Sequence, residues 1–256
     1  MEPMRLAIMQ PTYLPWLGYF DMIDQVDEFV LLDDVQVVKR SWGVRNRIKT
    51  AQGELMLSIP TSKERPRRER LYSNTRVNDD HPWMDKHLRS VEQAYGKAPF
   101  FEEVIRDYEQ LLRGHDRRLG RLNGRIIRWI AEKIGIQTAI SRASDLPEID
   151  GRKDRRLVAI CRKKGADSYL SAQGSAAYIE AERPGGAFGL HGIELYYHHY
   201  DHPVYPQLYG DFLPSMCVLD LLFNCGYSDA LGVIRKGRRA PYPREEFVKH
   251  WHDEED

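Results

Sequence analysis

The first 34 residues arrange their apolar and turn-forming side chains as a strand, a turn, a helix and a second strand. Residues 5–10 are a short apolar run of the kind that a buried strand has. Pro11 and Pro15 exclude a continuing central strand, and apolar side chains then recur at helical spacing over residues 18–26. Residues 28–32 are apolar again. This order begins an α/β unit, in which ligands bind at the carboxyl ends of the strands.

The rest of the chain continues this alternation with one helical interruption. Residues 154–164 have the pattern of a helix capped by Gly165, and 141–153 that of a loop. Further strands are predicted at 54–60, 168–171 and 194–200, helices within 80–135, and a short helix at 217–226. We therefore expect an α/β fold: a Rossmann-like sheet with an inserted helical region, residues about 80–135. One domain is expected over residues 1–240, followed by a charged C-terminal tail at 241–256 that frays.

Composition excludes several classes of protein. The 256 residues include 38 basic and 38 acidic ones, so the net charge is zero, and 42% are hydrophobic, as in a globular protein. A chain without net charge is not expected to bind along the phosphate backbone of a nucleic acid, although local basic patches can occur. No apolar run reaches the ~18 residues of a membrane span. The first residues lack a basic stretch followed by an apolar one, so we expect no secretion signal. Three cysteines without a CxxC pair argue against a disulfide framework. We expect a cytoplasmic protein with reduced thiols.

Polar and aromatic residues surround the turn after the first strand. Gln10, Tyr13, Trp16 and Tyr19 lie there without core periodicity, which indicates a binding wall; a packed turn with core aromatics is the alternative. At the end of the second strand the chain has a pair of carboxylates and an amide, which are Asp33, Asp34 and Gln36. These groups suit a general base, an amine anchor or metal ligands, whereas the structural alternative is a capped turn.

Residues 39–49 contain five cations and a tryptophan. Guanidinium groups bind phosphate and carboxylate bidentately, so this segment is a candidate anion clamp; pairing with the nearby acids is the alternative. Its candidate binding residues are Arg40, Trp42, Arg45, Asn46 and Lys49. Residues 61–72 form a charged loop with five further basic residues, for which a solvated loop is the simpler interpretation. Docking of a carrier such as tRNA or an acidic carrier protein by residues 61–76 is the functional alternative.

A second candidate group lies within residues 196–226. Three histidines at 198, 199 and 202 invite a zinc hypothesis, but tyrosines interrupt them and Pro203 follows, so we expect no metal site. Instead, His202, Tyr205 and Gln207 are predicted to line a pocket. The chain has no GxxxxGK[ST] and no GxGxxG motif, and no cofactor is expected.

Several of these motifs resemble the WbqC-like family. The strings are QPTYLPWLGYF at 10–20, LDDVQ at 32–36, KRSW at 39–42, RNRIK at 45–49, HPVYPQ at 202–207 and LDLLFNCG at 219–226. The resemblance covers about residues 5–235. It implies a protein similar to those encoded among bacterial surface-polysaccharide genes. It also implies a role in moving an aminoacyl group, glycine in particular, onto an amino sugar.

Three hypotheses follow. The first is an acyl or aminoacyl transferase acting on an amine of a sugar or related small molecule, with Asp33, Asp34 and Arg45 as catalytic residues. Its donor would be an acyl-CoA, an adenylate or an aminoacyl-tRNA. The second is a nucleotidylyltransferase or ligase. Adenylyl-transferring α/β folds have an HxGH motif in the turn after the first strand, and its absence here counts against this hypothesis. The third is a non-catalytic ligand-binding protein. The first requires that Gln10, the two aspartates and the Arg45–Asn46 step meet in one cavity.

Overall fold

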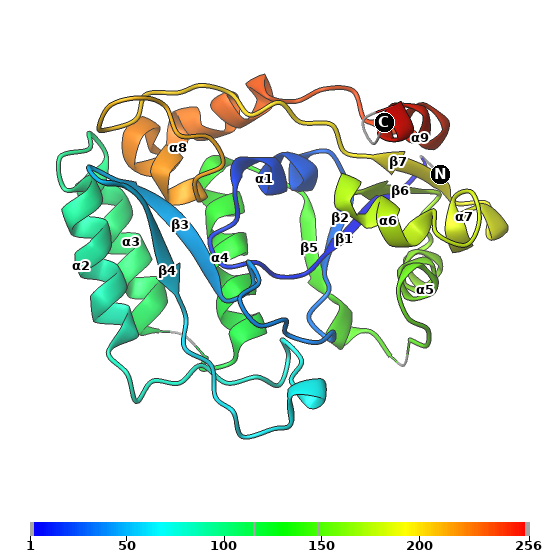
Figure 1. The fold of residues 1–256 in the computed structure, drawn as a ribbon, viewed down its shortest axis with the longest axis horizontal. Coiled ribbons are helices and arrows are strands. Elements are labelled where there is room, and N and C mark those ends of the chain that lie inside the picture. The colour runs from blue at the N-terminus through cyan, green and yellow to red at the C-terminus, as the bar shows by residue number, and fades with distance from the viewer. Residues whose placement is uncertain (1–2, 115, 148, 254–256) are drawn as a thin grey trace.

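The computed structural model describes residues 3–114, 116–147 and 149–253. Its main sheet has six strands in the order β5-β2-β1-β6-β7-β8 (Figure 1). The pairs between the first five strands are parallel, and β8 is antiparallel to β7. The strands are β1 (Arg5–Met9), β2 (Glu28–Leu31), β5 (Ala139–Arg142), β6 (Ser168–Ser171), β7 (Glu194–Tyr197) and β8 (Tyr242–Pro243).

Both faces of this sheet are covered, because successive strand residues point to opposite sides. Ala7 and Phe29 belong to one apolar core, whereas Leu6, Ile8 and Val30 belong to the other. The first core is shared with α1 (Leu17–Asp24), α4 (Leu119–Ile134) and α8 (Val218–Lys236). The second is shared with α5 (Asp154–Lys164), α6 (Ala176–Ile179), α7 (Gly186–Leu190) and α9 (Arg244–Asp253). The predicted α/β fold with a Rossmann-like sheet is confirmed.

The predicted helical insertion is also present. Between β2 and β5 the chain forms α2 (Trp83–Tyr95), α3 (Phe101–Arg113) and α4, and α4 ends at Gly135 with a left-handed φ of 89°. A separate hairpin of β3 (Arg45–Thr50) and β4 (Gly53–Ser58) precedes them and lies beside α2, away from the main sheet (Figure 1). Short 3-10 turns complete the elements, namely η1 (Arg67–Glu69), η2 (Ala143–Asp145) and η3 (Gln173–Ser175).

Three boundaries differ from the sequence prediction. Strand β5 falls partly in the predicted loop at 141–153, because it is a polar edge strand without an apolar run. The helix predicted to end near Gly226 continues to Lys236 after a break there, where φ is 74°. The basic segment 45–50 forms strand β3, which the sequence does not predict as a strand because Ile48 is its one apolar residue.

The predicted charged tail is part of the fold as far as residue 253. Residues 242–243 form β8 on the sheet edge, and α9 packs against it. The Phe247 ring is buried and stacks on Tyr197 with ring centroids 4.1 Å apart. Arg244 also donates to Glu180 at 2.9 Å. The apolar residues of α9 hold the segment, and residues 254–256 lie outside the described part. Among the helices of the described residues, no segment combines the length and apolarity that crossing a membrane needs.

Candidate functional site

The sheet has its topological switch point at β1. The next strand in the chain, β2, lies on one side of β1, and β6 lies on the other. Ligands of open α/β sheets bind outside the carboxyl ends of the strands at such a point. A cavity of about 280 Å³ lies there, next to the end of β1 and the start of α1. We call it the Trp16 cavity.

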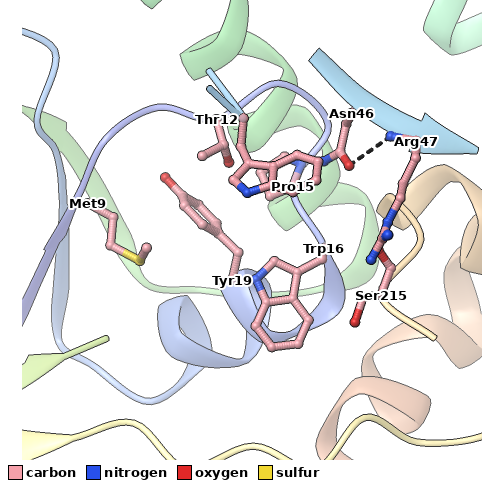
Figure 2. A pocket seen from close by; sticks show the side chains of 9 residues that line it. Met9, Thr12, Pro15, Trp16, Tyr19, Asn46, Arg47 and Ser215 are labelled. Atoms are coloured by element: carbon pink, nitrogen blue, oxygen red, sulfur yellow. Dashed lines mark hydrogen bonds between the residues drawn. The ribbon is translucent and has the colours of Figure 1, made fainter. Parts of the chain in front are cut away.

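Figure 2 shows that its walls come from distant segments of the chain. Met9 ends β1, while Trp16 and Tyr19 lie at the start of α1, and Arg47 on β3 closes the side opposite Met9. Within the described residues, nine line the cavity: Met9, Thr12, Pro15, Trp16, Tyr19, Trp42, Asn46, Arg47 and Ser215.

Two exposed tryptophans form much of the apolar surface. Trp16 is 37% exposed and Trp42 is 49% exposed, and neither indole N–H has a hydrogen-bond partner within the described ranges. The Arg47 guanidinium lies 5.9 Å from the Trp42 ring and donates to Ser215 O at 3.2 Å and to Glu54 at 3.0 Å. Exposed aromatic faces beside a cation are typical of a binding surface for a ring with polar substituents.

The first turn of α1 accommodates the Trp16 ring through a glycine. A Cβ atom on Gly18 would lie 2.4 Å from that ring, so only a residue without a side chain allows the indole to cover the helix start. The position of Trp16 over this turn therefore depends on the Trp-Leu-Gly sequence at 16–18.

The polar side chains of the lining are hydroxyl, amide, indole and guanidinium groups. The Thr12 Oγ1 atom is buried and has no partner among the described residues. The Tyr19 hydroxyl donates to Gln10 O at 3.1 Å, and burial raises the pKa of Tyr19 well above its usual range, so this hydroxyl stays neutral. Among the described residues that line the cavity, none has a carboxylate or an imidazole. The cavity thus suits a carbonyl or anionic oxygen better than a cation.

Side-chain amides hold the loop between β1 and α1. Asn46 Nδ2 donates to the carbonyls of Tyr13 and Leu14, at 3.1 and 2.7 Å, and Leu14 has a φ of 47°. Asn123 Nδ2 donates to Pro11 O and Gly43 O, each at 2.8 Å. The wall of the cavity is therefore a fixed backbone conformation, which agrees with a preformed site.

Comparison with known proteins identifies the family. Residues 10–230 match the WbqC-like protein family. The chain belongs to this family. Over 224 residues it is 35% identical to "Uncharacterized protein Rv1507c" of Mycobacterium tuberculosis (strain ATCC 25618 / H37Rv), covering 87% of this chain and 94% of that one. No solved structure matches significantly.

Two residues of the 10–20 motif of this WbqC-like protein, Gln10 and Tyr13, have structural roles and do not line the cavity. The Tyr13 side chain is fully buried, and its hydroxyl lies 2.9 Å from His87 Nδ1 and 2.6 Å from the Tyr108 hydroxyl. Tyr13 is therefore a core residue and not part of the predicted binding wall. Gln10 accepts from the Tyr72 hydroxyl at 3.3 Å and does not line the cavity. Of the four residues predicted there, Trp16 and Tyr19 reach it.

The two predicted catalytic carboxylates lie elsewhere in this WbqC-like protein. Asp33 is 1% exposed and accepts from the Ser144 backbone at 2.9 Å and from the Ser144 hydroxyl at 2.7 Å. Asp34 forms an ion pair with Arg156. Because each carboxylate caps or pairs with a neighbouring element, neither faces the Trp16 cavity. The prediction that Gln10, the two aspartates, Arg45 and Asn46 meet in one cavity is wrong. Among the described residues of that group, only Asn46 lines the Trp16 cavity.

Three further predicted binding residues form a buried network. Lys49, 3% exposed, donates to Gln207 at 3.2 Å. Gln207 and the Tyr205 hydroxyl donate to Asp220 at 2.7 and 2.8 Å, and Tyr95 completes the set at 2.8 Å. Burial raises the pKa of Asp220. The network holds the segment between β7 and α8, which contains Tyr205 and Gln207, against β3 and α8. None of these residues is among those that line the Trp16 cavity.

His202 packs against Trp16, which lines the cavity, and is not itself among the lining residues. Its ring stacks on Trp16 with centroids 6.2 Å apart, and Nδ1 donates to Pro203 O at 3.0 Å. Nε2 is buried without a partner in the described residues, and burial lowers the pKa of His202, so the ring is neutral near pH 7. His198 instead contacts Asp21 at 2.7 Å. Across residues 3–114, 116–147 and 149–253, no group of three His, Cys, Asp or Glu side chains is placed to hold a metal ion.

The remaining predicted residues are distributed over the neighbouring surface. Gln36 donates to Arg67 O at 3.0 Å, and Arg40, exposed with a φ of 60°, lines a separate cavity. Arg45 is half-buried, with Nε unpartnered among the described residues. Trp42 does line the Trp16 cavity. Thr12 and Arg47 line the cavity although neither was predicted to do so. The sequence signal for Arg47 is the charged side chain at every second position of β3, at 45, 47 and 49.

Proposed function

We propose that this chain is a transferase that moves an acyl or aminoacyl group, of the glycyl type, onto an amine of a sugar or related small molecule. The product would belong to a polysaccharide or natural-product pathway of the cytoplasm. The observation that carries the proposal is the Trp16 cavity, where unpaired donors and aromatic faces surround a space of about 280 Å³ at the switch point of the sheet.

The aromatic walls suit a sugar ring, because the C–H faces of a sugar pack against indole faces while its hydroxyls take the polar groups. Trp16 and Trp42 are the candidates for this contact. The Thr12 hydroxyl and the Arg47 guanidinium are the candidates for the acyl oxygen. Of these two groups, the Thr12 hydroxyl is buried without a partner among the described residues, and a ligand oxygen would satisfy it by accepting from it.

The chemical step is attack of the amine nitrogen on the acyl carbonyl carbon. A C–N bond forms, negative charge collects on the carbonyl oxygen, and the bond to the leaving group then breaks as the carbonyl re-forms. Thr12 and Arg47 would stabilise the oxyanion, an effect that is worth about 10²–10³ in rate for one donor. The amine of an amino sugar is partly unprotonated near neutral pH. After its attack the positively charged nitrogen loses one of its two protons to solvent, so the step does not require a carboxylate.

The test combines the purified chain with a glycyl donor (a thioester of coenzyme A, an adenylate or glycyl-tRNA) and a panel of amino sugars. The expected result is an acceptor whose mass rises by one glycyl group. Thr12→Val and Arg47→Gln are each expected to lower the rate at least about tenfold. Arg113→Gln is the matched control, because Arg113 also pairs with a glutamate but lies on α3 outside the cavity. Equal rates in all variants contradict the assignment of the site.

A second candidate function is ligand binding without turnover. It is favoured because none of the described residues in the lining has a carboxylate or an imidazole. Under this alternative, amino sugars bind and are released unchanged with every donor. Binding that is lost in Trp16→Ala, together with no mass gain, would decide for it. Release of pyrophosphate from ATP or CTP would instead favour the nucleotidylyl-transfer hypothesis.

A further inference from the structure

We propose that a second cavity binds the phosphate groups of a small polyphosphate ligand, such as a nucleoside di- or triphosphate. This basic cavity has a volume of about 340 Å³ and lies between residues 37–44, residues 61–70 and Thr75. Its loop 61–70 belongs to the cyan segment at the bottom of Figure 1. Five of its lining residues are cationic: Lys39, Arg40, Lys63, Arg67 and Arg70.

The positive charge of the basic cavity is not compensated by the part of the chain that the structure describes. There, no lining residue is acidic, and the charged groups of the five cations form no hydrogen bond or ion pair. Glu69 pairs with Arg68 at 3.6 Å, outside the lining, and Glu64 lines a neighbouring depression together with Lys63. In a chain of zero net charge, such a local excess of positive charge indicates an anionic ligand.

A buried hydroxyl gives an independent indication of a ligand. Thr75 is 3% exposed and lines the cavity, and its Oγ1 has no hydrogen-bond partner among the described residues. The Nε atom of Arg70 is likewise buried and unpartnered. Such donors are rarely left unsatisfied in a folded protein, and a phosphate oxygen in the cavity would accept from both.

Main-chain contacts hold the walls of the basic cavity together. Val37 N donates to Arg70 O at 2.8 Å, and Ser62 N donates to Arg76 O at 2.9 Å. Isolated bridges also join Gln36 to Leu71 and Thr61 to Val77. The loop that carries the cations is therefore anchored on both sides, which lowers the cost of ordering it around a ligand.

The number of cations and the shape of the cavity favour a polyphosphate. Guanidinium groups bind phosphate oxygens bidentately, and five cations match the charge of a di- or triphosphate better than that of one phosphate. A concave space of this volume suits a small molecule. The segment 40–47 separates the two cavities, since Arg40 and Val44 line the basic cavity and Trp42 and Arg47 line the Trp16 cavity. Polyphosphate binding here does not require the Trp16 cavity to be catalytic.

The experiment is calorimetric titration of the full chain with tripolyphosphate, ATP and inorganic phosphate at low and high salt. Tripolyphosphate and ATP are expected to bind at least about tenfold more tightly than inorganic phosphate, and salt is expected to weaken both. The paired substitution Lys39→Glu with Arg67→Glu is expected to weaken tripolyphosphate at least about tenfold. Arg89→Glu with Lys97→Glu makes the same change of charge at exposed positions outside the cavity and is expected to leave binding within about twofold.

Thr75→Val tests the buried hydroxyl without changing charge, and a loss of about tenfold is expected because this donor would meet a charged oxygen. No binding of tripolyphosphate by the wild-type chain overturns the proposal. Equal loss in the two charge-reversal pairs overturns it as well, because the effect would then be non-specific. Inorganic phosphate that binds as tightly as tripolyphosphate excludes a polyphosphate site. A single-stranded RNA is titrated in the same way. If it binds far more tightly than ATP, the proposal of a small polyphosphate ligand is overturned and RNA is the ligand of this cavity.

Discussion

The hydroxyl of Tyr13 lies 2.9 Å from Nδ1 of His87, inside the core between the β1–α1 loop and α2. His87 Nε2 lies 3.2 Å from Ser58 O and can only donate to it, so Nδ1 accepts from Tyr13. Tyr13 in turn accepts from the Tyr108 hydroxyl at 2.6 Å. A chain of hydrogen bonds thus joins α3, the loop, α2 and β4, and it anchors the loop that forms one wall of the Trp16 cavity.

Tyr13→Phe is expected to lower the free energy of unfolding by about 1–3 kcal/mol, because it leaves a buried imidazole acceptor and a buried hydroxyl donor without partners. Urea unfolding followed by circular dichroism measures this difference. Tyr196→Phe is the matched control, since that hydroxyl donates to Glu194 at the surface, and a change below about 0.5 kcal/mol is expected. Equal stabilities of the two variants would show that the buried chain of hydrogen bonds contributes nothing.

Stability is expected to fall in mild acid because of His87. Burial lowers the pKa of His87 from 6.5 to about 4, so between these values the unfolded chain binds a proton that the folded chain excludes. The free energy of unfolding therefore decreases as pH falls from about 6.5 to about 4, by a total of about 3 kcal/mol from this group.

Urea unfolding of the wild type and His87→Gln at pH 7 and pH 4.5 separates this contribution from that of the carboxylates. The variant is expected to lose less stability between the two pH values than the wild type. His191→Gln replaces an exposed histidine and is expected to keep the wild-type dependence. The assignment fails if His87→Gln shows the full wild-type decrease.

The start of the sheet and the helical insertion were predictable because they depend on local patterns. The apolar runs of β1 and β2, and Gly135 at the end of α4, carry their own signals. The direction of side chains in the irregular loops was not predictable, because their partners are distant in sequence. Tyr13 contacts a histidine 74 residues away, and Asp33 contacts a serine 111 residues away. The sequence pattern therefore located the region of the site but did not separate its lining from its supports.

Gly18→Ala is expected to displace the Trp16 indole, because the added Cβ would lie 2.4 Å from the ring. Ligand affinity of the Trp16 cavity should fall at least about fivefold, whereas stability changes by less than about 1 kcal/mol, since alanine favours helix. Tryptophan fluorescence and a ligand titration with an amino sugar measure the two effects. Gly232→Ala on α8, where no atom lies within 4 Å of the added Cβ, is expected to change neither. An unchanged affinity in Gly18→Ala would mean that the position of this indole is irrelevant to binding.

Asp33→Asn separates a structural role from a catalytic one. The carboxylate accepts from both the backbone and the hydroxyl of Ser144, and an amide can replace only one of its two acceptor oxygens. A loss of about 1–2 kcal/mol in the free energy of unfolding is expected. Because Asp33 does not line the Trp16 cavity, ligand affinity and any glycyl transfer should match the wild type below the unfolding transition. Asp80→Asn, at an exposed position, controls for the change of charge. If Asp33→Asn abolishes glycyl transfer while the protein remains folded, Asp33 takes part in the reaction. The reacting amine would then bind beside η2 and not beside Trp16.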